Sequence, residues 1–261
     1  MTERDIQFAA RTLWENWQQS RRIEELPQHG RPADRVDAYA IQTRLAELSG
    51  QGIAGWKIAA TSRAGQAHIG VDGPLAGRLL KERVVESGAR ISLTGNIMRV
   101  AEAEFAFRFR RDLEKRKEPY SLVEVLSAVE SLHPAIEVPD SRFEDYTVVG
   151  APQLIADNAC ACWFILGTPT EANWRKFDLV QHKVDGYRNL EHSSSGIGAN
   201  VLGDPRVALT WIANELSQFG EGLLAGQVVT TGTCITPIPV TPGDQVRMDF
   251  GAFGSVEVQF S

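Results

Sequence analysis

The stretch AEAEFAF, residues 101–107, sets the geometry from which the rest of the chain can be interpreted. Side chains alternate between the two faces of a β-strand, so its two phenylalanines face one side while Glu102 and Glu104 face the other. Two like charges a few ångströms apart are costly to bury unless a positive group compensates them. The stretch therefore predicts either an edge strand with a solvated acidic face or a buried site that holds a cation.

Length and composition indicate a globular protein with room for a large core. The 261 residues are 43% hydrophobic and 23% charged, and the net charge is −6. This acidic balance argues against nucleic acid or an anionic membrane as the partner. No apolar run approaches the roughly 18 residues of a membrane span, and the N-terminus is too polar for a signal peptide. We therefore expect a cytoplasmic protein, which its three cysteines also fit; the C-x-C at Cys160 and Cys162 lies in an apolar run typical of a buried strand.

Hydrophobic periodicity changes near residue 50. Before it, apolar residues at helical spacing predict two helices, with the expected buried positions Phe8, Ala9, Leu13 and Trp17 in the first and Val36 among those of the second. After it, short strands alternate with turns, and two further helices are expected over residues 121–132 and 204–219. We predict an α+β fold with a helical N-terminal lobe (residues 1–50) and a mainly β catalytic domain (residues 51–261).

A third carboxylate joins the acidic pair. Glu137 follows a short apolar run and precedes Pro139, which places it at the end of a strand. Together with Glu102 and Glu104 it could form a three-oxygen site of the kind that Mg²⁺ and Mn²⁺ prefer. A solvated glutamate face remains the alternative interpretation of the same spacing.

Lys57 lies between Trp56 and Ile58 in the apolar stretch GWKIAATS. Lysine is seldom buried without a partner, so near carboxylates it could be an acid–base group or a substrate clamp. Alternatively its ammonium group reaches the surface along the strand. Asp157, just before another apolar strand, could orient ligands or simply form the turn that enters the strand.

Seven motifs occur in the order found in the hydratase/decarboxylase branch of the fumarylacetoacetate hydrolase superfamily, which the chain resembles over nearly its whole length. The motifs are RVDAYAIQ (35–42), GWKIAATS (55–62), AEAEFAF (101–107), PAIEVPDSRF (134–143), IADNA (155–159), GANVLGDPRVALTWIANEL (198–216) and PGDQVRMDFGAFGSVEVQF (242–260).

This resemblance implies a mixed β-roll core and a metal-dependent hydratase of aromatic-compound catabolism. Its substrate would be a 2-oxo acid, and water would add to the conjugated double bond of the 2-hydroxy-dienoate form. The resemblance assigns Mg²⁺ or Mn²⁺ to Glu102, Glu104 and Glu137, and a catalytic role to Lys57. The candidates for substrate contact are Ser62, Phe105, Arg142 and Asp157.

Alternative functions share the same metal motif. A 2-oxo-enedioate decarboxylase would need an extra cation for the second carboxylate, for which Arg142 is the candidate; an acylpyruvate C–C hydrolase is a further alternative. A non-catalytic subunit that pairs with a related decarboxylase is the third. One departure keeps these open: Leu75 follows Pro74 where many hydratases carry an aspartate, and Asp72 lies two residues before the proline.

We predict a homo-oligomer larger than a dimer, as is usual in this family. Trp14, Trp17 and Trp211 lie on predicted helices and could supply apolar contact surface, which is hazardous to leave exposed on a monomer. Light scattering at micromolar concentration should give a mass above that of two chains. A monomeric mass would contradict this prediction.

Overall fold

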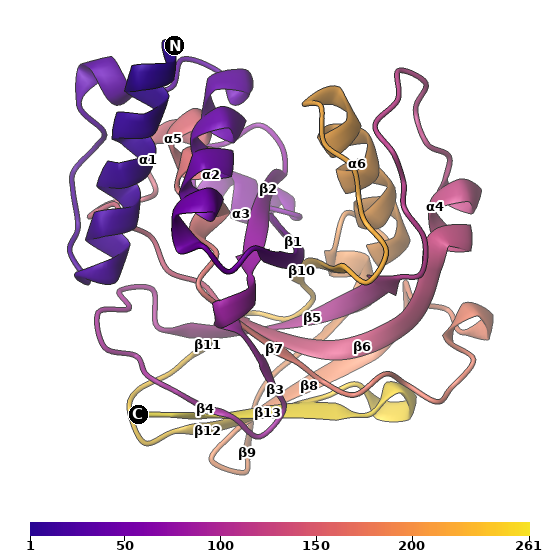
Figure 1. Cartoon of the computed structure of the whole chain (residues 1–261). Coiled ribbons are helices and arrows are strands. Elements are labelled where there is room, and N and C mark those ends of the chain that lie inside the picture. The colour runs from indigo at the N-terminus through magenta and orange to yellow at the C-terminus, as the bar shows by residue number, and fades with distance from the viewer.

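Two β-sheets form the centre of the protein, and helices cover one side of the larger sheet (Figure 1). The computed structural model describes residues 1–261. The larger sheet has the order β2-β1-β10-β5-β6-β7-β3, with β11 paired to β5. Its strands are β1 (Ile53–Ala59), β2 (Leu75–Leu80), β3 (Val84–Glu86), β5 (Val100–Phe109), β6 (Val129–Val138), β7 (Trp163–Leu166), β10 (Val228–Thr233) and β11 (Ile238–Pro239).

The smaller sheet has the order β4-β13-β12-β8-β9 and lies below the larger one in the view of Figure 1. Its strands are β4 (Arg90–Ile91), β8 (Lys183–Arg188), β9 (Glu191–Ile197), β12 (Gln245–Asp249) and β13 (Ser255–Phe260). Antiparallel pairing dominates both sheets, so this is a mixed α/β fold with a curled sheet and not a doubly wound parallel one.

Six α-helices complete the fold: α1 (Glu3–Gln18), α2 (Arg35–Ser49), α3 (Arg63–His68), α4 (Leu122–Ala128), α5 (Gly150–Ala156) and α6 (Pro205–Gln218). Local sequence explains their ends: Thr2 and Asp5 form a capping box at the start of α1, and Gly50 ends α2 in the left-handed conformation, with φ of 69°. None of the helices is both long and apolar enough to cross a membrane.

Strand β5 shows the alternation expected from its sequence. Ala103, Phe105 and Phe107 are fully buried in a core of 59 residues that also contains Leu13 and Trp17 of α1. The first two helices therefore share one hydrophobic core with the strands. The opposite face of β5 carries the two glutamates.

Two details of the predicted elements are wrong. The helix expected over residues 121–132 ends at Ala128, and Val129 begins β6. Residues 129–138 pair with β5, so their backbone groups form hydrogen bonds between strands and not within a helix. Phe8 and Val36 are exposed by 39% and 64%; Phe8 lies against the ring of His29, at the edge of the helix pair.

Gly55 allows β1 and β10 to approach closely: a Cβ at this position would lie 1.8 Å from the carbonyl oxygen of Val228. Gly55→Ala should therefore push the paired strands apart and lower the free energy of unfolding by about 1–3 kcal/mol or more, measured by urea denaturation. Gly73→Ala is the matched control, because its Cβ would lie 4.0 Å from the nearest side chain and should change stability by less than about 0.5 kcal/mol. Equal stability of the two variants would contradict the prediction.

Candidate active site

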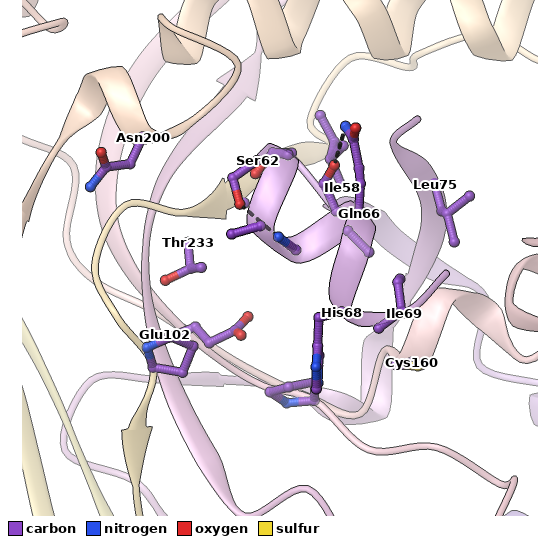
Figure 2. Close-up of a pocket in the computed structure, with 18 of the residues that line it drawn as sticks. Ile58, Ser62, Gln66, His68, Ile69, Leu75, Glu102, Cys160, Asn200 and Thr233 are labelled. Carbon is purple, nitrogen blue, oxygen red and sulfur yellow. Dashed lines mark hydrogen bonds between the residues drawn. The ribbon is translucent and has the colours of Figure 1, made fainter. Parts of the chain in front are cut away.

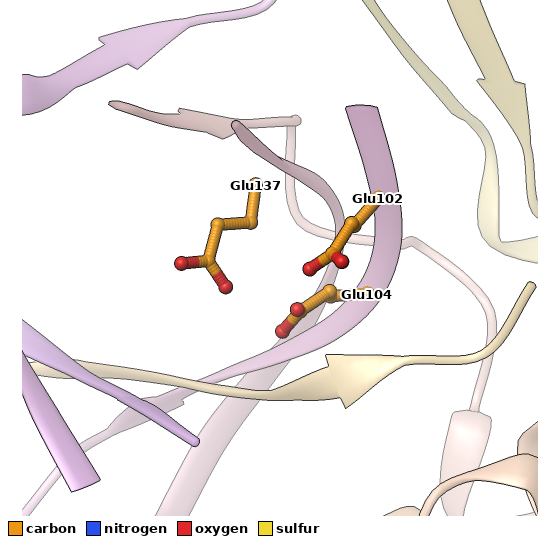
Figure 3. A group of neighbouring side chains, drawn as sticks. All are labelled: Glu102, Glu104 and Glu137. Atoms are coloured by element: carbon orange, nitrogen blue, oxygen red, sulfur yellow. The ribbon is translucent and has the colours of Figure 1, made fainter. Parts of the chain in front are cut away.

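Three carboxylates converge where β5 pairs with β6. The antiparallel register sets Glu102 opposite Glu137, and Glu104 lies two residues farther along the same face of β5. One oxygen from each carboxylate lies within 4.8 Å of the others, and Figure 3 shows the three groups turned toward one another. Glu104 and Glu137 are 0% and 1% exposed, and Glu102 is half-buried. The solvated acidic face considered from the sequence is therefore wrong for this strand.

Strand β10 orients one of these carboxylates. Glu104 Oε2 accepts a hydrogen bond from the hydroxyl of Thr230 and another from the amide of Gly232, at 2.7 Å. Glu104 Oε1 and Glu137 Oε2 are buried and accept no hydrogen bond from the protein. Buried carboxylate oxygens normally have a partner, so this oxygen-rich site fits a hard divalent cation.

Lys57 is buried beside the carboxylates. Its side chain is 4% exposed, and Nζ lies 2.9 Å from Glu137 Oε1. The ammonium group also donates a hydrogen bond of 3.0 Å to the carbonyl oxygen of Ala159. Lys57 therefore does not reach the surface; it is the buried cation of the cluster.

One ammonium does not balance three carboxylates. Burial raises the pKa of Glu102 to about 7, with a further contribution from the charge of Glu137. The same two causes raise the pKa of Glu104 well above its usual value. Burial lowers the pKa of Lys57, but the charges of Glu137 and Glu104 more than offset this and raise it to about 12. The cluster thus carries a deficit of positive charge.

The cluster opens into a cavity of about 1030 Å³ (Figure 2). Lys57, Glu102 and Glu104 line it at one end. Its other polar lining residues include Ser62, Gln66, His68, Asn200 and Thr233, and its apolar ones include Ile69, Leu75, Met98, Val100, Leu154 and Leu202. In Figure 2 the Glu102 carboxylate points into the open space, across from α3 and Leu75.

The short helix α3 forms part of the cavity wall. Ser62 caps it by accepting a hydrogen bond of 3.0 Å from the amide of Gly65, and Gln66 donates one of 3.0 Å to the carbonyl oxygen of Ala60. Both bonds appear in Figure 2 and tie α3 to the end of β1, which carries Lys57.

Known proteins resemble the chain over its full length. The 2-hydroxyhexa-2,4-dienoate hydratase of Comamonas testosteroni is 31% identical over 261 residues, which cover 98% of this chain and 97% of the relative. The 2-keto-4-pentenoate hydratase of Paraburkholderia xenovorans (strain LB400) is 32% identical over 263 residues, covering 100% and 96%. A scan against models of protein families gives no match.

A solved structure agrees with these relatives. The 4-oxalocrotonate decarboxylase from Pseudomonas putida G7, complexed with magnesium and adipate, superposes with a TM-score of 0.90 at 29% identity and covers 100% of this chain and 99% of that one. This chain belongs to the hydratase/decarboxylase branch of the fumarylacetoacetate hydrolase superfamily. The family predicted from the seven motifs is confirmed.

Four of the eight residues predicted for the site line the cavity, and a fifth is in contact with one of them. Lys57, Ser62, Glu102 and Glu104 line it, and Glu137 lies behind them, against Lys57. Phe105 does not line the cavity. It lies on the opposite face of β5, fully buried, with its ring 5.2 Å from that of Phe250. Because side chains alternate along a strand, Phe105, the neighbour of Glu104, could not point to the same side as the two glutamates.

Arg142 and Asp157 also lie away from the cavity, although both were predicted to contact substrate. Both side chains are 0% exposed and form an ion pair through Arg142 Nε and Asp157 Oδ1. Asp157 Oδ2 accepts further hydrogen bonds from the amide of Arg142 at 3.0 Å and the hydroxyl of Ser141 at 2.7 Å. The guanidinium lies 4.3 Å from the ring centre of Trp17. These contacts occupy both charges, so neither residue is free to bind a ligand.

The sequence interpretation missed the groups that hold the cluster in place. Thr230 and Gly232 orient Glu104, and the carbonyl of Ala159 accepts from Lys57. The polar run TTGT inside an otherwise apolar strand was a usable signal for β10. Nothing in the sequence distinguishes a backbone carbonyl such as that of Ala159.

Leu75, which follows Pro74 where the family resemblance implies an aspartate, forms part of the cavity wall. It is the first residue of β2, fully buried, and lines the cavity. Asp72 is exposed and does not line the cavity, so it does not replace an aspartate at that position. The wall at Leu75 is apolar.

Glu104→Gln tests the carboxylate cluster. The amide keeps the shape and can still accept from Thr230 and Gly232, but it removes one negative charge. Affinity for Mn²⁺, measured by titration calorimetry on metal-stripped protein, should fall by about 10-fold or more. Replacing a residue that only supports a metal ligand already costs about 10-fold in affinity, and replacing a ligand should cost at least as much. Glu130→Gln, an exposed position on the same strand as Glu137, is the control and should bind like the wild type. Equal affinities for all three proteins would show that the metal binds elsewhere.

Proposed function

We propose that this protein is a hydratase that adds water to a short 2-hydroxy-dienoate, the enol form of a 2-oxo-alkenoate, in the catabolism of aromatic compounds. The observation that carries the proposal is the buried cluster of three carboxylates and Lys57 at one end of a cavity, in a chain that matches two hydratases over its full length.

Glu102, Glu104 and Glu137 would hold Mg²⁺ or Mn²⁺. The unpartnered oxygens of Glu104 and Glu137 and the excess negative charge of the cluster support this assignment. When bound, the cation supplies Lewis-acid stabilisation of negative charge that develops on the substrate oxygens.

Lys57 would act as an electrostatic donor. Two of the three N–H groups of its ammonium face Glu137 and the carbonyl of Ala159, which leaves one for the cavity. A fixed donor in a water-poor site stabilises charge that develops in the transition state more than it stabilises the ground state. The hydroxyl of Ser62 accepts from Gly65 and keeps its own hydrogen, so Ser62 can donate to a bound substrate.

The position of Arg142 favours hydration over decarboxylation. A dicarboxylate needs a second cation, and the ion pair with Asp157 removes the candidate from the cavity. Apart from Lys57, the basic residues that line the cavity are Arg63 and His68, both exposed on α3. The wall formed by Ile69, Leu75 and Leu154 suits an uncharged alkenyl tail. The likeness to 4-oxalocrotonate decarboxylase makes decarboxylation of a 2-oxo-enedioate the second candidate.

A homo-oligomer is part of the proposal. Trp17 is buried against Arg142, so it is not available for contact between subunits, whereas Trp14 of α1 and Trp211 of α6 pack against the core but remain partly exposed. The intact carboxylate cluster argues against a purely non-catalytic subunit.

The direct test follows the loss of dienol absorbance from 2-hydroxypenta-2,4-dienoate with Mg²⁺ present. A parallel assay measures CO₂ release from a 2-oxo-enedioate. Turnover of the dienoate supports the proposal. Release of CO₂ without hydration of the dienoate would make the protein a decarboxylase, and inactivity in both assays would reject both candidates.

Lys57→Met should lower kcat by about 10²–10³-fold, because losing one such donor removes stabilisation that acts mainly in the transition state. Affinity for Mn²⁺ should not fall, since the three glutamates remain and the competing ammonium is gone. Lys183→Met, at an exposed position on β8, is the matched control. If Lys57→Met turns over within about twofold of the wild type, Lys57 is structural and its proposed role is wrong.

A further inference from the structure

The turn formed by Asn158, Ala159 and Cys160 has an unusual backbone. All three residues have positive φ, at 56°, 49° and 60°. Asparagine adopts this left-handed conformation more readily than most residues, but alanine and cysteine do so at a cost in free energy. Such strain persists only where the surrounding structure imposes it, and it concentrates at functional sites.

Contacts with β2 impose the conformation on one side. Asn158 is fully buried, and its side chain pairs with the backbone of Arg78 in both directions: Oδ1 accepts from the Arg78 amide at 2.7 Å, and Nδ2 donates to the Arg78 carbonyl at 2.7 Å. Gly77 makes this approach possible, because a Cβ there would lie 2.3 Å from the carbonyl oxygen of Asn158. In the β1–β2 register Gly77 is the partner of Lys57. The turn therefore lies directly over the strand pair that carries Lys57.

Arg142 holds the other side of the turn. Besides its ion pair with Asp157, its guanidinium donates to the carbonyl oxygens of Asp157 and Ala161, the residues that flank the turn. Arg142 and Asp157, which were expected to contact substrate, thus support the backbone next to Lys57.

The outcome of these contacts is the position of one carbonyl group. Ala159 O accepts a hydrogen bond of 3.0 Å from Lys57 Nζ, while the carboxylate of Glu137, with Oε1 2.9 Å from Nζ, attracts the same ammonium mainly by its charge. Coulomb attraction is weakly directional, and an ammonium on a four-carbon side chain rotates freely. A carbonyl acceptor at a fixed point removes this freedom and leaves the third N–H for the cavity.

We propose that Asn158 is a positioning residue for Lys57: by fastening the left-handed turn to β2, it sets the Ala159 carbonyl that orients the Lys57 ammonium. This inference rests on the proposed function for its consequence in catalysis, but the positioning itself is independent of the substrate.

Asn158→Ala is the primary test. Misplacement of a catalytic group by a fraction of an ångström to an ångström lowers rates by up to about 100-fold, so kcat should fall by about 10–100-fold. KM should stay within about twofold, and Mn²⁺ affinity should be unchanged, because the glutamates are untouched. Gly77→Ala should push the turn away from β2 by a different route. It should likewise lower kcat while KM stays within about twofold.

The chain offers a matched control in Asn214 on α6. Its side chain makes the same pair of bonds with one backbone unit: Oδ1 accepts from the Tyr120 amide at 2.6 Å, and Nδ2 donates to the Tyr120 carbonyl at 3.1 Å. Asn214 does not line the cavity. Asn214→Ala should therefore lose stability as Asn158→Ala does, but keep the wild-type kcat. Equal losses of kcat in both variants, or a folded Asn158→Ala with kcat within about twofold of wild type, would overturn the proposal.

A readout without substrate separates this proposal from the proposed function. In ¹H–¹⁵N spectra of the wild type, the Lys57 ammonium, identified by its absence in Lys57→Met, should give a slowly exchanging signal with a nuclear Overhauser contact to Ala159. The signal should shift or exchange rapidly in Asn158→Ala. An ammonium that already exchanges rapidly in the wild type would overturn the proposal even if no variant folds. If the wild type does not hydrate the dienoate but shows the ordered ammonium, the proposed function fails and the positioning role stands.

Discussion

The repulsion among three buried carboxylates is the constraint on which the rest of the structure depends. Oxygens of Glu102, Glu104 and Glu137 lie within 4.8 Å of one another, with one ammonium, that of Lys57, beside them. Such a cluster persists only on a rigid frame, because flexible side chains would turn away from each other. The register of β5 against β6 is part of that frame: a slip of one residue would turn Glu102 and Glu104 into the apolar core and the phenylalanines toward the cavity.

The ion pair between Lys57 and Glu137 shows why the sheet must curl. Lys57 is on β1 and Glu137 on β6, and β10 and β5 lie between them in the sheet. Three spacings of about 4.8 Å would separate the two strands by about 14 Å in a flat sheet, too far for an ion pair at 2.9 Å without curvature or fully extended side chains. Curling turns one face of the sheet inward, so that groups from four strands meet there. The intervening strand β10 contributes Thr230 and Gly232 to the same point.

Buried polar residues outside the cavity also help to position the residues that line it. Arg142 and Asp157 form an ion pair, and Arg142 also contacts Trp17 of α1 and donates to the carbonyls that flank the turn whose Ala159 oxygen accepts from Lys57. The helical N-terminal residues are thereby linked to the chemistry without lining the cavity. The cavity itself combines a highly charged end with an apolar wall at Leu75, an arrangement that suits a small acid with an uncharged tail.

The sequence by itself determined the local facts of this protein: which face of residues 101–107 carries the glutamates, that Glu137 ends a strand before Pro139, and the branch to which the motifs belong. These follow from the period of a strand, from the missing amide hydrogen of proline and from the order of motifs. Only the tertiary structure decided that Lys57 pairs with Glu137, that residues 129–132 are strand and not helix, and that Arg142 and Asp157 lie outside the cavity. Those outcomes depend on which strands become neighbours and on partners such as Trp17 that are distant in the chain, and side-chain periodicity carries no information about packing over such distances.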